Sequence, residues 1–252
     1  MIEVLILSFI QGVTEFIPVS SSSHLILISN FLDFDDKGLA IDVSLHIGSF
    51  LGILFYFRKD IFNFFQNKEL FFKIFISSVP VLIVGFLLIQ TNIIDRIRNI
   101  EVIAWTTIIF GVLLYFSDKF KLNNKLEKNF SIKSAIIIGV FQILSLVPGV
   151  SRSGITITAA RILNFNRLDS AKISFLMSIP ILGAVSIFGL KNIITSPDIN
   201  FSILNFISIF FSFLFSLLTI KYFLDFLKRF NLNFFVFYRV TLGIVLLFIS
   251  SL

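Results

Sequence analysis

The chain has 252 residues, 56% of them hydrophobic, and its mean hydropathy is +0.97. Soluble domains of this size are about half apolar and alternate apolar with polar faces, so this composition excludes an ordinary soluble domain. Cysteine is absent, which excludes a disulfide framework and a thiolate metal site. The formal net charge of +6 comes from basic residues in short loops between apolar blocks, so no nucleic-acid partner is expected.

Apolar blocks follow one another along the chain, and the longer ones match the ~20 residues that cross a hydrocarbon core as a helix. The blocks lie at approximately 1–17, 23–32, 40–57, 70–91, 100–117, 132–147, 153–163, 171–190, 201–222 and 232–252. The first begins almost at Met1, with no basic region before it, so a cleavable signal peptide is not expected. We expect one all-α polytopic domain over 1–252, surrounded by membrane lipids.

Two pairs of blocks are broken by short polar segments. Only "PVSSS" separates 1–17 from 23–32, and only "PGVSRS" separates 132–147 from 153–163. At a rise of about 1.5 Å per residue, the second member of each pair is too short for a core of ~30 Å. A half-helix broken in this way predicts a re-entrant hairpin, which is tolerated only inside protein or beside a watery cavity. We therefore expect about six full transmembrane helices plus two re-entrant helical hairpins.

The charges of the loops indicate an orientation. With this arrangement, 15 of the 21 Lys and Arg residues fall on one side of the membrane and four on the other, together with the acidic loop "DFDDKG" at 33–38. The positive-inside rule makes the richer side cytoplasmic. Both termini then face outward, and the two hairpins enter from opposite sides.

Opposite entry of the hairpins fits an internal repeat. A shift of 131 residues aligns four identical pairs: Gln11 with Gln142, Val19 with Val150, Ser20 with Ser151, and Ser22 with Ser153. Together with opposite insertion, this pattern indicates an inverted-topology repeat with pseudo-repeats at approximately 1–117 and 132–252. The two hairpin tips are then expected to meet near the membrane midplane.

Few ionisable residues fall at membrane depth, where a charge costs several kcal/mol and by default faces a cavity. Glu15 and His24 belong to the first hairpin, and Arg152 to the loop of the second. Three other ionisable residues lie near the ends of full spans. We expect Arg239 to be structural or to snorkel to the interface, and Asp42 to lie at a helix start, where it is favourable to the helix dipole. A structural pairing and a functional role are about equally expected for His46.

The second loop, "PGVSRSGITIT", has the composition of an anion site. After a Pro-Gly break, the N–H groups at the start of a half-helix are unpaired, and an arginine fork beside them suits phosphate. "PVSSSSH" adds a second helix start with hydroxyls and an imidazole, and four serines in succession exceed what capping requires. The candidate phosphate-binding residues are Ser20, Ser22, Gly149, Ser151, Arg152, Ser153 and Thr156.

Gln11 lies one helical turn before Glu15, so the two side chains share a face. A diphosphate carries about two or three negative charges, more than one arginine neutralises. A carboxylate and an amide oxygen together suit a hard divalent cation, Mg²⁺ or Ca²⁺. A serine or His24 would be the nucleophile, or His24 the base that activates a serine. This set describes phosphoryl hydrolysis of a membrane substrate, with a structural Glu15–Arg152 salt bridge as the alternative.

"QGVTEFIPVSSSSHLIL" and "PGVSRSGITIT" together resemble the undecaprenyl-diphosphate phosphatase family of the bacitracin-resistance type. That family carries Glu or Gln four residues before a Glu, then P-V/I/T-S-S-x-x-H, and later PGxSRSxxT. The resemblance covers essentially the whole chain. It implies removal of the terminal phosphate of undecaprenyl diphosphate, a polyprenyl diphosphate lipid, to recycle the carrier of peptidoglycan synthesis. It also implies a metal-dependent enzyme of the bacterial cytoplasmic membrane, with a site open to the outer face.

By motif position, Gln11 and Glu15 resemble the family's metal-associated pair, and Ser21 and His24 the hydroxyl and histidine of its catalytic loop. Arg152 resembles the diphosphate-binding arginine. Gln11 stands where many members carry Glu, which weakens a two-carboxylate metal site. The nucleophile stays open between Ser21 and His24, and we favour Ser21 assisted by His24. A homodimer is also left open.

Two other classes of membrane protein are alternatives. Inverted repeats with broken helices are typical of transporters, so a polyprenyl-lipid flippase or transporter is the main alternative. A nucleophile and a base beside an anion clamp favour the hydrolase, because a carrier needs neither. An intramembrane serine protease fits poorly, since Arg152 is hard to place in an apolar peptide site and the only histidines, His24 and His46, both come early.

Overall fold

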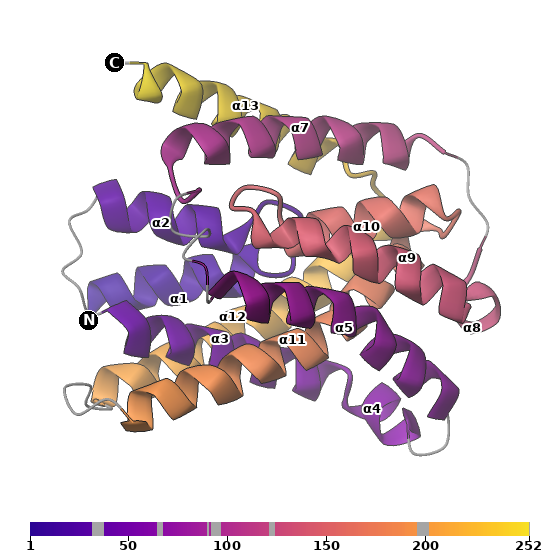
Figure 1. Ribbon diagram of the computed structural model, residues 1–252, viewed down its shortest axis with the longest axis horizontal. Coiled ribbons are helices and arrows are strands. Elements are labelled where there is room, and N and C mark those ends of the chain that lie inside the picture. Colours follow the sequence, from indigo (N-terminus) through magenta and orange to yellow (C-terminus); the bar gives the residue numbers. More distant parts are fainter. Residues whose placement is uncertain are drawn as a thin grey trace.

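The computed structural model describes residues 1–31, 38–64, 68–89, 91, 97–120, 124–195 and 202–251. Within these ranges the protein is helical, and its one isolated bridge joins Asn124 to Phe165 (Figure 1). The helices are α1 Ile2–Thr14, α2 Ser21–Phe31, α3 Gly38–Tyr56, α4 Arg58–Phe64, α5 Lys68–Ile89, α7 Ile100–Asp118, α8 Leu126–Asn129, α9 Ile132–Ile143, the 3₁₀ turn η1 Leu144–Leu146, α10 Arg152–Ile162, α11 Arg167–Thr195, α12 Ile203–Leu227 and α13 Asn233–Ser250.

Among the described residues, five helices are long and apolar enough to cross a membrane: α5, α7, α11, α12 and α13. The sixth predicted span, 40–57, corresponds to α3, whose apolar part Ala40–Tyr56 lies at the short end of spanning lengths. Large apolar side chains cover the outside of these helices, as expected of a surface that faces lipid. The predicted all-α polytopic membrane fold is confirmed.

The two broken segments form short helical hairpins. Helices α1 and α2, with 13 and 11 residues, are both too short to cross ~30 Å. Figure 1 shows α1 and α2 running between the left end of the molecule and its centre, and α9 and α10 running between the right end and the centre. The two hairpins therefore enter from opposite ends, and their tips meet in the middle.

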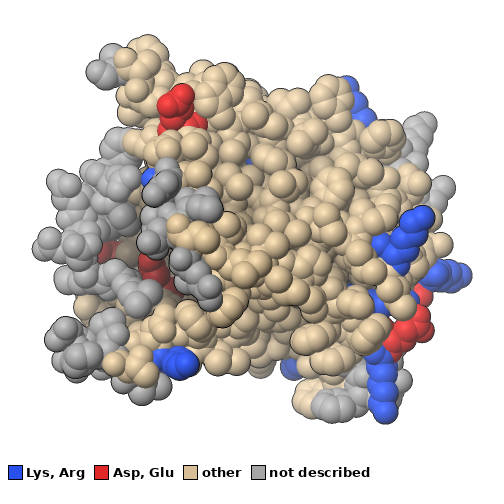
Figure 2. All heavy atoms as spheres, in the orientation of Figure 1, with Lys and Arg blue, Asp and Glu red and all other residues tan. Residues whose placement is uncertain are grey.

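The two ends of the molecule differ in charge. Both termini lie at the left end in Figure 1, whereas Lys and Arg side chains gather at the right edge of the same view in Figure 2. Helices α4 and α8 lie at this basic end. The acidic loop 33–38 falls almost entirely outside the described residues. The distribution agrees with the division of charge that the sequence predicts.

Corresponding elements of the two halves pack in the same order. Adding 131 to the bounds of α2, Ser21–Phe31, reproduces those of α10, Arg152–Ile162. Helix α1 packs on α12 as α9 packs on α5, and α3 packs on α12 as α11 packs on α5. These correspondences support an inverted repeat, and the pseudo-repeat boundaries at 1–117 and 132–252 stay a prediction.

Small residues let α12 hold the first hairpin and α3 at close range. A Cβ at Gly12 of α1 would lie 2.6 Å from the Phe215 Cβ, and one at Gly48 of α3 would lie 2.7 Å from the Ser212 Cβ. The Ser49 hydroxyl bonds the hydroxyl of Ser212 at 3.1 Å. Membrane helices associate through such close packing and interhelical hydrogen bonds, because lipid provides no hydrophobic drive between them.

Candidate active site

The two hairpin tips are joined directly and through Arg239 of α13. The Ser153 hydroxyl donates to the Ile17 carbonyl oxygen at 2.8 Å. Arg239 is fully buried, and its Nη2 donates to the carbonyl oxygens of Gly149 and Val150 at 2.9 and 3.0 Å. Its Nη1 donates to the Pro18 carbonyl oxygen at 3.4 Å, and its Nε to that of Thr107 at 3.2 Å. Arg239 thus fixes both loops from inside the protein rather than snorkelling to the surface.

Both tips contain residues with left-handed backbone. Ser20 and Ser151 have φ of 76° and 71°, a conformation that costs a non-glycine residue of order 1–3 kcal/mol and is common at functional sites. The Ser151 hydroxyl accepts the Gly154 N–H at 3.1 Å and so caps α10. At Gly149, with φ 91°, a Cβ would lie 2.0 Å from the Thr106 hydroxyl oxygen, so only glycine fits.

The Glu15 carboxylate lies at the centre of the meeting point and accepts three hydrogen bonds. Arg152 Nη2 donates to Oε1 at 2.6 Å, while the Ser21 hydroxyl and Gln11 Nε2 donate to Oε2 at 2.7 and 3.1 Å. Glu15 is buried, with a side chain 8% exposed, and the Arg152 side chain is 12% exposed. Three donors and an opposite charge compensate the cost of burying this carboxylate.

A small pocket of about 60 Å³ opens beside this cluster, lined by Thr14, Glu15, Ser20, Ser21, Ser22, Ser145, Ser151 and Arg152. One water needs about 10–15 Å³ on this measure, so the pocket has room for a few small groups, about the size of one phosphate. Its lining combines hydroxyls with one guanidinium and one carboxylate. Such a lining suits a phosphate group better than an apolar ligand.

Three of the predicted phosphate-binding residues lie outside this pocket. Gly149 packs against α7, and Ser153 is bonded to the Ile17 carbonyl. The Thr156 hydroxyl donates to the Arg152 carbonyl oxygen at 2.8 Å, and it lies 2.7 Å from the Ser174 hydroxyl. Their geometry supports the loop from behind, and a direct phosphate contact by any of them stays a prediction.

Both ring nitrogens of His24 are bonded to groups other than Ser21. Its Nδ1 lies 2.6 Å from the Ser20 carbonyl oxygen, and its Nε2 lies 2.5 Å from the Tyr238 hydroxyl. A carbonyl oxygen only accepts, so Nδ1 donates, and in the neutral ring Nε2 then accepts from Tyr238. The structure therefore pairs Ser21 with Glu15, whereas the sequence favoured a pairing with His24. The ring of His24 faces α13, where its Nε2 is bonded to the Tyr238 hydroxyl.

Residues 4–245 of this chain match the sequence profile of the family described as Bacitracin resistance protein BacA. The chain belongs to that family. The undecaprenyl-diphosphatase of Pelagibacter ubique (strain HTCC1062) is 48% identical over 250 residues, which cover 98% of this chain and 97% of that protein. The undecaprenyl-diphosphatases of Jannaschia sp. (strain CCS1) and Saccharophagus degradans (strain 2-40 / ATCC 43961 / DSM 17024) are 38% and 39% identical, over 97% and 94% of this chain and 97% and 93% of theirs.

The oxygen atoms around Glu15 fit a hard divalent cation in part. Gln11 Oε1 is buried and has no hydrogen-bond partner in the described part of the chain, so it is available as a ligand. No group of three or more His, Cys, Asp or Glu able to hold a metal occurs among the described residues. Mg²⁺ is commonly bound by one or two carboxylates plus substrate phosphates, which is compatible with Gln11 and Glu15 in this BacA-family chain.

Four residues of the site escaped the sequence predictions: Thr14, Ser145, Ser174 and Tyr238. Thr14 and Ser145 line the pocket, and the 131-residue shift that aligns Gln11 with Gln142 also aligns these two. That signal could have found them. Ser174, whose carbonyl oxygen accepts from Arg152 Nη1 at 3.3 Å, and Tyr238 come from distant helices and carry no local motif.

Proposed function

We propose that this chain hydrolyses undecaprenyl diphosphate to undecaprenyl phosphate and inorganic phosphate, and so recycles the lipid carrier of peptidoglycan synthesis. Relatives that this chain matches over nearly their whole length are named undecaprenyl-diphosphatase. The observation that carries the proposal is the buried cluster of Glu15, Ser21 and Arg152 beside a pocket of phosphate size. An acid, a hydroxyl and a cation in contact are the groups that phosphoryl transfer requires.

In the reaction we propose, the Ser21 oxygen attacks the terminal phosphorus while its proton passes to Glu15 Oε2, to which it is already bonded. The bond from that phosphorus to the bridging oxygen breaks, and undecaprenyl phosphate leaves. Water then cleaves the phosphoserine, which releases inorganic phosphate and restores the hydroxyl. Arg152 and the N-terminal amides of α10 balance the negative charge throughout.

His24 stays the alternative nucleophile of this proposal. Its Nε2 accepts the Tyr238 hydroxyl, so the ring would have to leave that partner before attacking phosphorus or taking a proton. Ser21 needs no such rearrangement to reach Glu15, which is why we favour it.

We further propose that Gln11 and Glu15 hold a divalent cation, Mg²⁺ or Ca²⁺, together with the diphosphate of the substrate. When bound, such a cation neutralises phosphate charge and polarises the phosphoryl oxygen. The unpartnered Gln11 Oε1 supports this assignment. A chelator should abolish phosphate release, and readdition of the cation should restore it.

The proposed setting is the bacterial cytoplasmic membrane, with the site open to the outer face and the basic end in the cytoplasm. The gathering of Lys and Arg at the end opposite both termini supports this orientation (Figure 2). The partners are the polyprenyl diphosphate lipid and bilayer lipids, and a homodimer stays a prediction.

The proposal is tested by phosphate release from polyprenyl diphosphate by the purified protein. We expect Glu15→Gln, Arg152→Ala and Ser21→Ala each to lower turnover by about 10²–10⁴-fold, the range of acid–base contributions. Thr195→Ala, at the exposed end of α11, is the matched hydroxyl control and should keep full activity. Undiminished turnover in both Glu15→Gln and Arg152→Ala would refute the site.

The same variants separate a phosphatase from a lipid carrier. The opposed hairpins would also suit a flippase, which needs no nucleophile. If the chain only moves lipid, wild-type protein releases no phosphate and Ser21→Ala keeps transport between the leaflets of liposomes. That pair of results would replace the hydrolase proposal with the carrier.

A further inference from the structure

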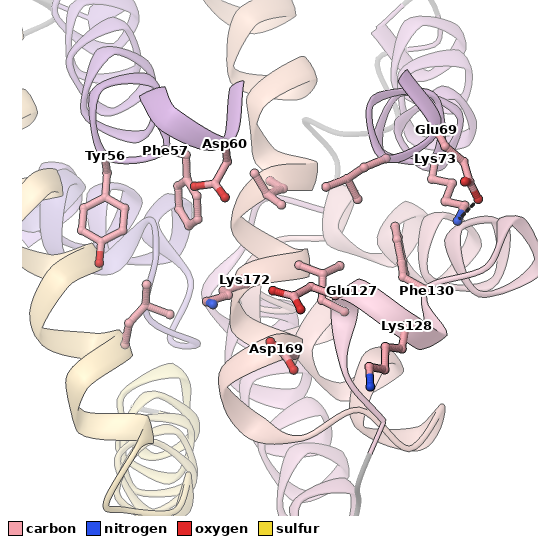
Figure 3. A pocket seen from close by; sticks show the side chains of 14 residues that line it. Tyr56, Phe57, Asp60, Glu69, Lys73, Glu127, Lys128, Phe130, Asp169 and Lys172 are labelled. Carbon is pink, nitrogen blue, oxygen red and sulfur yellow. Dashed lines mark ion pairs between the residues drawn. The ribbon is translucent and has the colours of Figure 1, made fainter. Parts of the chain in front are cut away.

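Two cavities lie at the basic end of the molecule, and their charges differ. The first, about 500 Å³, is lined by the carboxylates of Asp60, Glu69, Glu127 and Asp169 and by the lysines Lys73, Lys128 and Lys172. In Figure 3, Lys73 is paired with Glu69, and Glu127, Asp169 and Lys172 lie near one another. Acids and bases nearly balance in this cavity.

The second cavity is strongly cationic. It is a groove of about 520 Å³ where the ends of α7, α10, α11 and α12 meet, and we call it the α7–α11 groove. Its lining residues are Asp118, Lys119, Phe120, Arg161, Asn166, Arg167, Leu168, Leu227 and Lys228. Four basic side chains thus face one carboxylate. The positive-inside rule explains basic residues at this end in general, but the neighbouring balanced cavity shows that it does not require such an excess.

The single carboxylate of the groove is fully engaged in the fold. Asp118 Oδ1 accepts Arg167 Nε at 2.7 Å and lies 3.3 Å from Arg161 Nε, while Oδ2 accepts the Leu232 N–H at 3.0 Å. Arg161 is buried and donates to the carbonyl oxygens of Phe165, Asp118 and Phe120, each at 2.9 Å. Asp118 and Arg161 therefore form the floor of the groove, and one Asp cannot neutralise both arginines.

Three cations remain within reach of a ligand. The Arg167 side chain is 36% exposed, and its Nη1 makes no hydrogen bond to the described residues. Lys119 is exposed, with Nζ 4.2 Å from the centre of the Tyr115 ring. Lys228 pairs with Asp225 at 2.6 Å, but both are more than half exposed, so water weakens this pair and it can exchange for another anion.

The start of α11 adds two backbone donors. Asn166 caps the helix by accepting the Asp169 N–H at 2.9 Å, and the first helical residues, Arg167 and Leu168, line the groove. The N–H groups of a first helical turn have no intrahelical partner and lie at the positive end of the helix dipole. The Asp169 carboxylate is bonded to the Asn166 amide and lines the other cavity, so it does not occupy the groove.

Apolar surface borders the groove on its membrane side. Phe120, which lines it, is 57% exposed, and Phe116, one turn earlier on α7, is also 57% exposed. Phe230, which follows α12, and Phe234, in the first turn of α13, are 56% and 68% exposed. A ligand with an anionic head and apolar chains matches this combination, whereas a free phosphate would leave the aromatic border unused.

We propose that the α7–α11 groove binds the phosphate headgroup of an anionic phospholipid, such as phosphatidylglycerol, in the leaflet at the basic end. Arg167, Lys119 and Lys228 contact the phosphate oxygens, and the acyl chains lie along Phe116 and Phe120. Basic pockets between helix ends on the cytoplasmic side are typical sites for such lipids. The site is separate from the Glu15 cluster, so the proposal does not depend on the phosphatase activity.

Binding would stabilise the second hairpin. The groove holds the C-terminal end of α10 through Arg161, and the N-terminal end of the same helix carries Arg152. A ligand that binds only the folded protein raises its stability by mass action. Phosphatidylglycerol should therefore raise the melting temperature of the purified chain more than phosphatidylcholine does.

The test measures lipid binding by the full chain in detergent, with native mass spectrometry and thermal melting, using phosphatidylglycerol and phosphatidylcholine as probes. The variant Lys119→Gln/Lys228→Gln touches no buried group, and we expect it to weaken phosphatidylglycerol binding about tenfold or more. Lys59→Gln/Lys133→Gln removes the same charge from exposed sites at the same end and should change binding less than twofold. Arg167→Gln should also weaken binding, if it folds.

Three results would overturn the proposal. Equal losses in both double variants would mean a general surface charge effect. Undiminished binding in Lys119→Gln/Lys228→Gln would exclude the groove as the site. Competition by millimolar glycerol phosphate as effective as that by the lipid would identify a soluble phosphate ligand instead of a membrane lipid.

Discussion

At the scale of single residues, the site is organised by one carboxylate. Glu15 joins Gln11 of its own helix, Ser21 of the following half-helix and Arg152 of the opposite hairpin. Because all three donors converge on it, the position of Ser21 relative to Arg152 depends on Glu15. The carboxylate therefore positions these three groups relative to one another, and it is the group to which we assign the acid–base role in the proposed reaction.

Tyr238→Phe tests the contact that holds His24. The variant keeps the ring that stacks on His24, with centroids 5.7 Å apart, and removes only the hydroxyl. One hydrogen bond contributes about 0.5–1.5 kcal/mol, so we expect kcat to change by about 2- to 10-fold with KM nearly constant. The pH profile of phosphate release should shift as well, because Nε2 loses its donor.

Tyr222→Phe is the matched control for this variant, since Tyr222 is 63% exposed on α12. An unchanged rate and an unchanged pH profile in Tyr238→Phe would mean that His24 needs no positioning by α13. A loss of folding instead of activity would show as a lower melting temperature, which the control should not have.

At the scale of elements, small residues decide how closely the helices pack. The seam between α3 and α12 places Gly48 and Gly52 against Ser212 and Ser216, whose hydroxyls both bond Ser49. This seam fixes α3 against α12, and Gly12 lets α1 pack closely on the same helix, so α12 sets the position at which the first hairpin presents Glu15. Helix length also matters: α1 and α2, with 13 and 11 residues, reach only the centre of the molecule (Figure 1).

Gly48→Ala should loosen this seam. Its Cβ would lie 2.5 Å from the Ile209 carbonyl oxygen and 2.7 Å from the Ser212 Cβ, so the helices must separate. We expect a loss of about 1–3 kcal/mol in the free energy of unfolding, the usual cost of overpacking, measured by chemical denaturation in micelles. Gly85→Ala on α5 is the control, since the nearest atom there is Leu146 Cδ2 at 3.5 Å. Equal stability of both variants would contradict the tight seam.

At the scale of the whole molecule, the two ends differ in charge and the hairpins enter from both. The basic end carries the α7–α11 groove and the balanced cavity of Figure 3, while both chain termini lie at the other end (Figure 1). Opposed hairpins bring unlike loops together: one contributes hydroxyls and a carboxylate, and the other an arginine at a helix start. A site of mixed chemistry thus arises at the place where the two halves meet.

Single-cysteine labelling tests the orientation, and the absence of native cysteine makes it clean. Lys191→Cys lies at the less basic end and Lys128→Cys at the basic end, and both positions are exposed. In intact spheroplasts, a membrane-impermeant maleimide should label Lys191→Cys, and Lys128→Cys only after the membrane is permeabilised. The reverse pattern would invert the topology and place the entrance of the site in the cytoplasm.

The sequence by itself determined the class, the spans and the two broken hairpins, because hydropathy, helix length and Pro, Gly and Ser breaks are local properties of the chain. It also predicted Glu15, Ser21 and Arg152 as candidate site residues, since these lie within the two loop motifs. The tertiary structure alone decided which groups touch. Ser21 bonds Glu15, and His24 bonds Tyr238, which is 214 residues away. Partner choice depends on distances between helices, which are set by packing over the whole molecule and not by any short stretch of sequence.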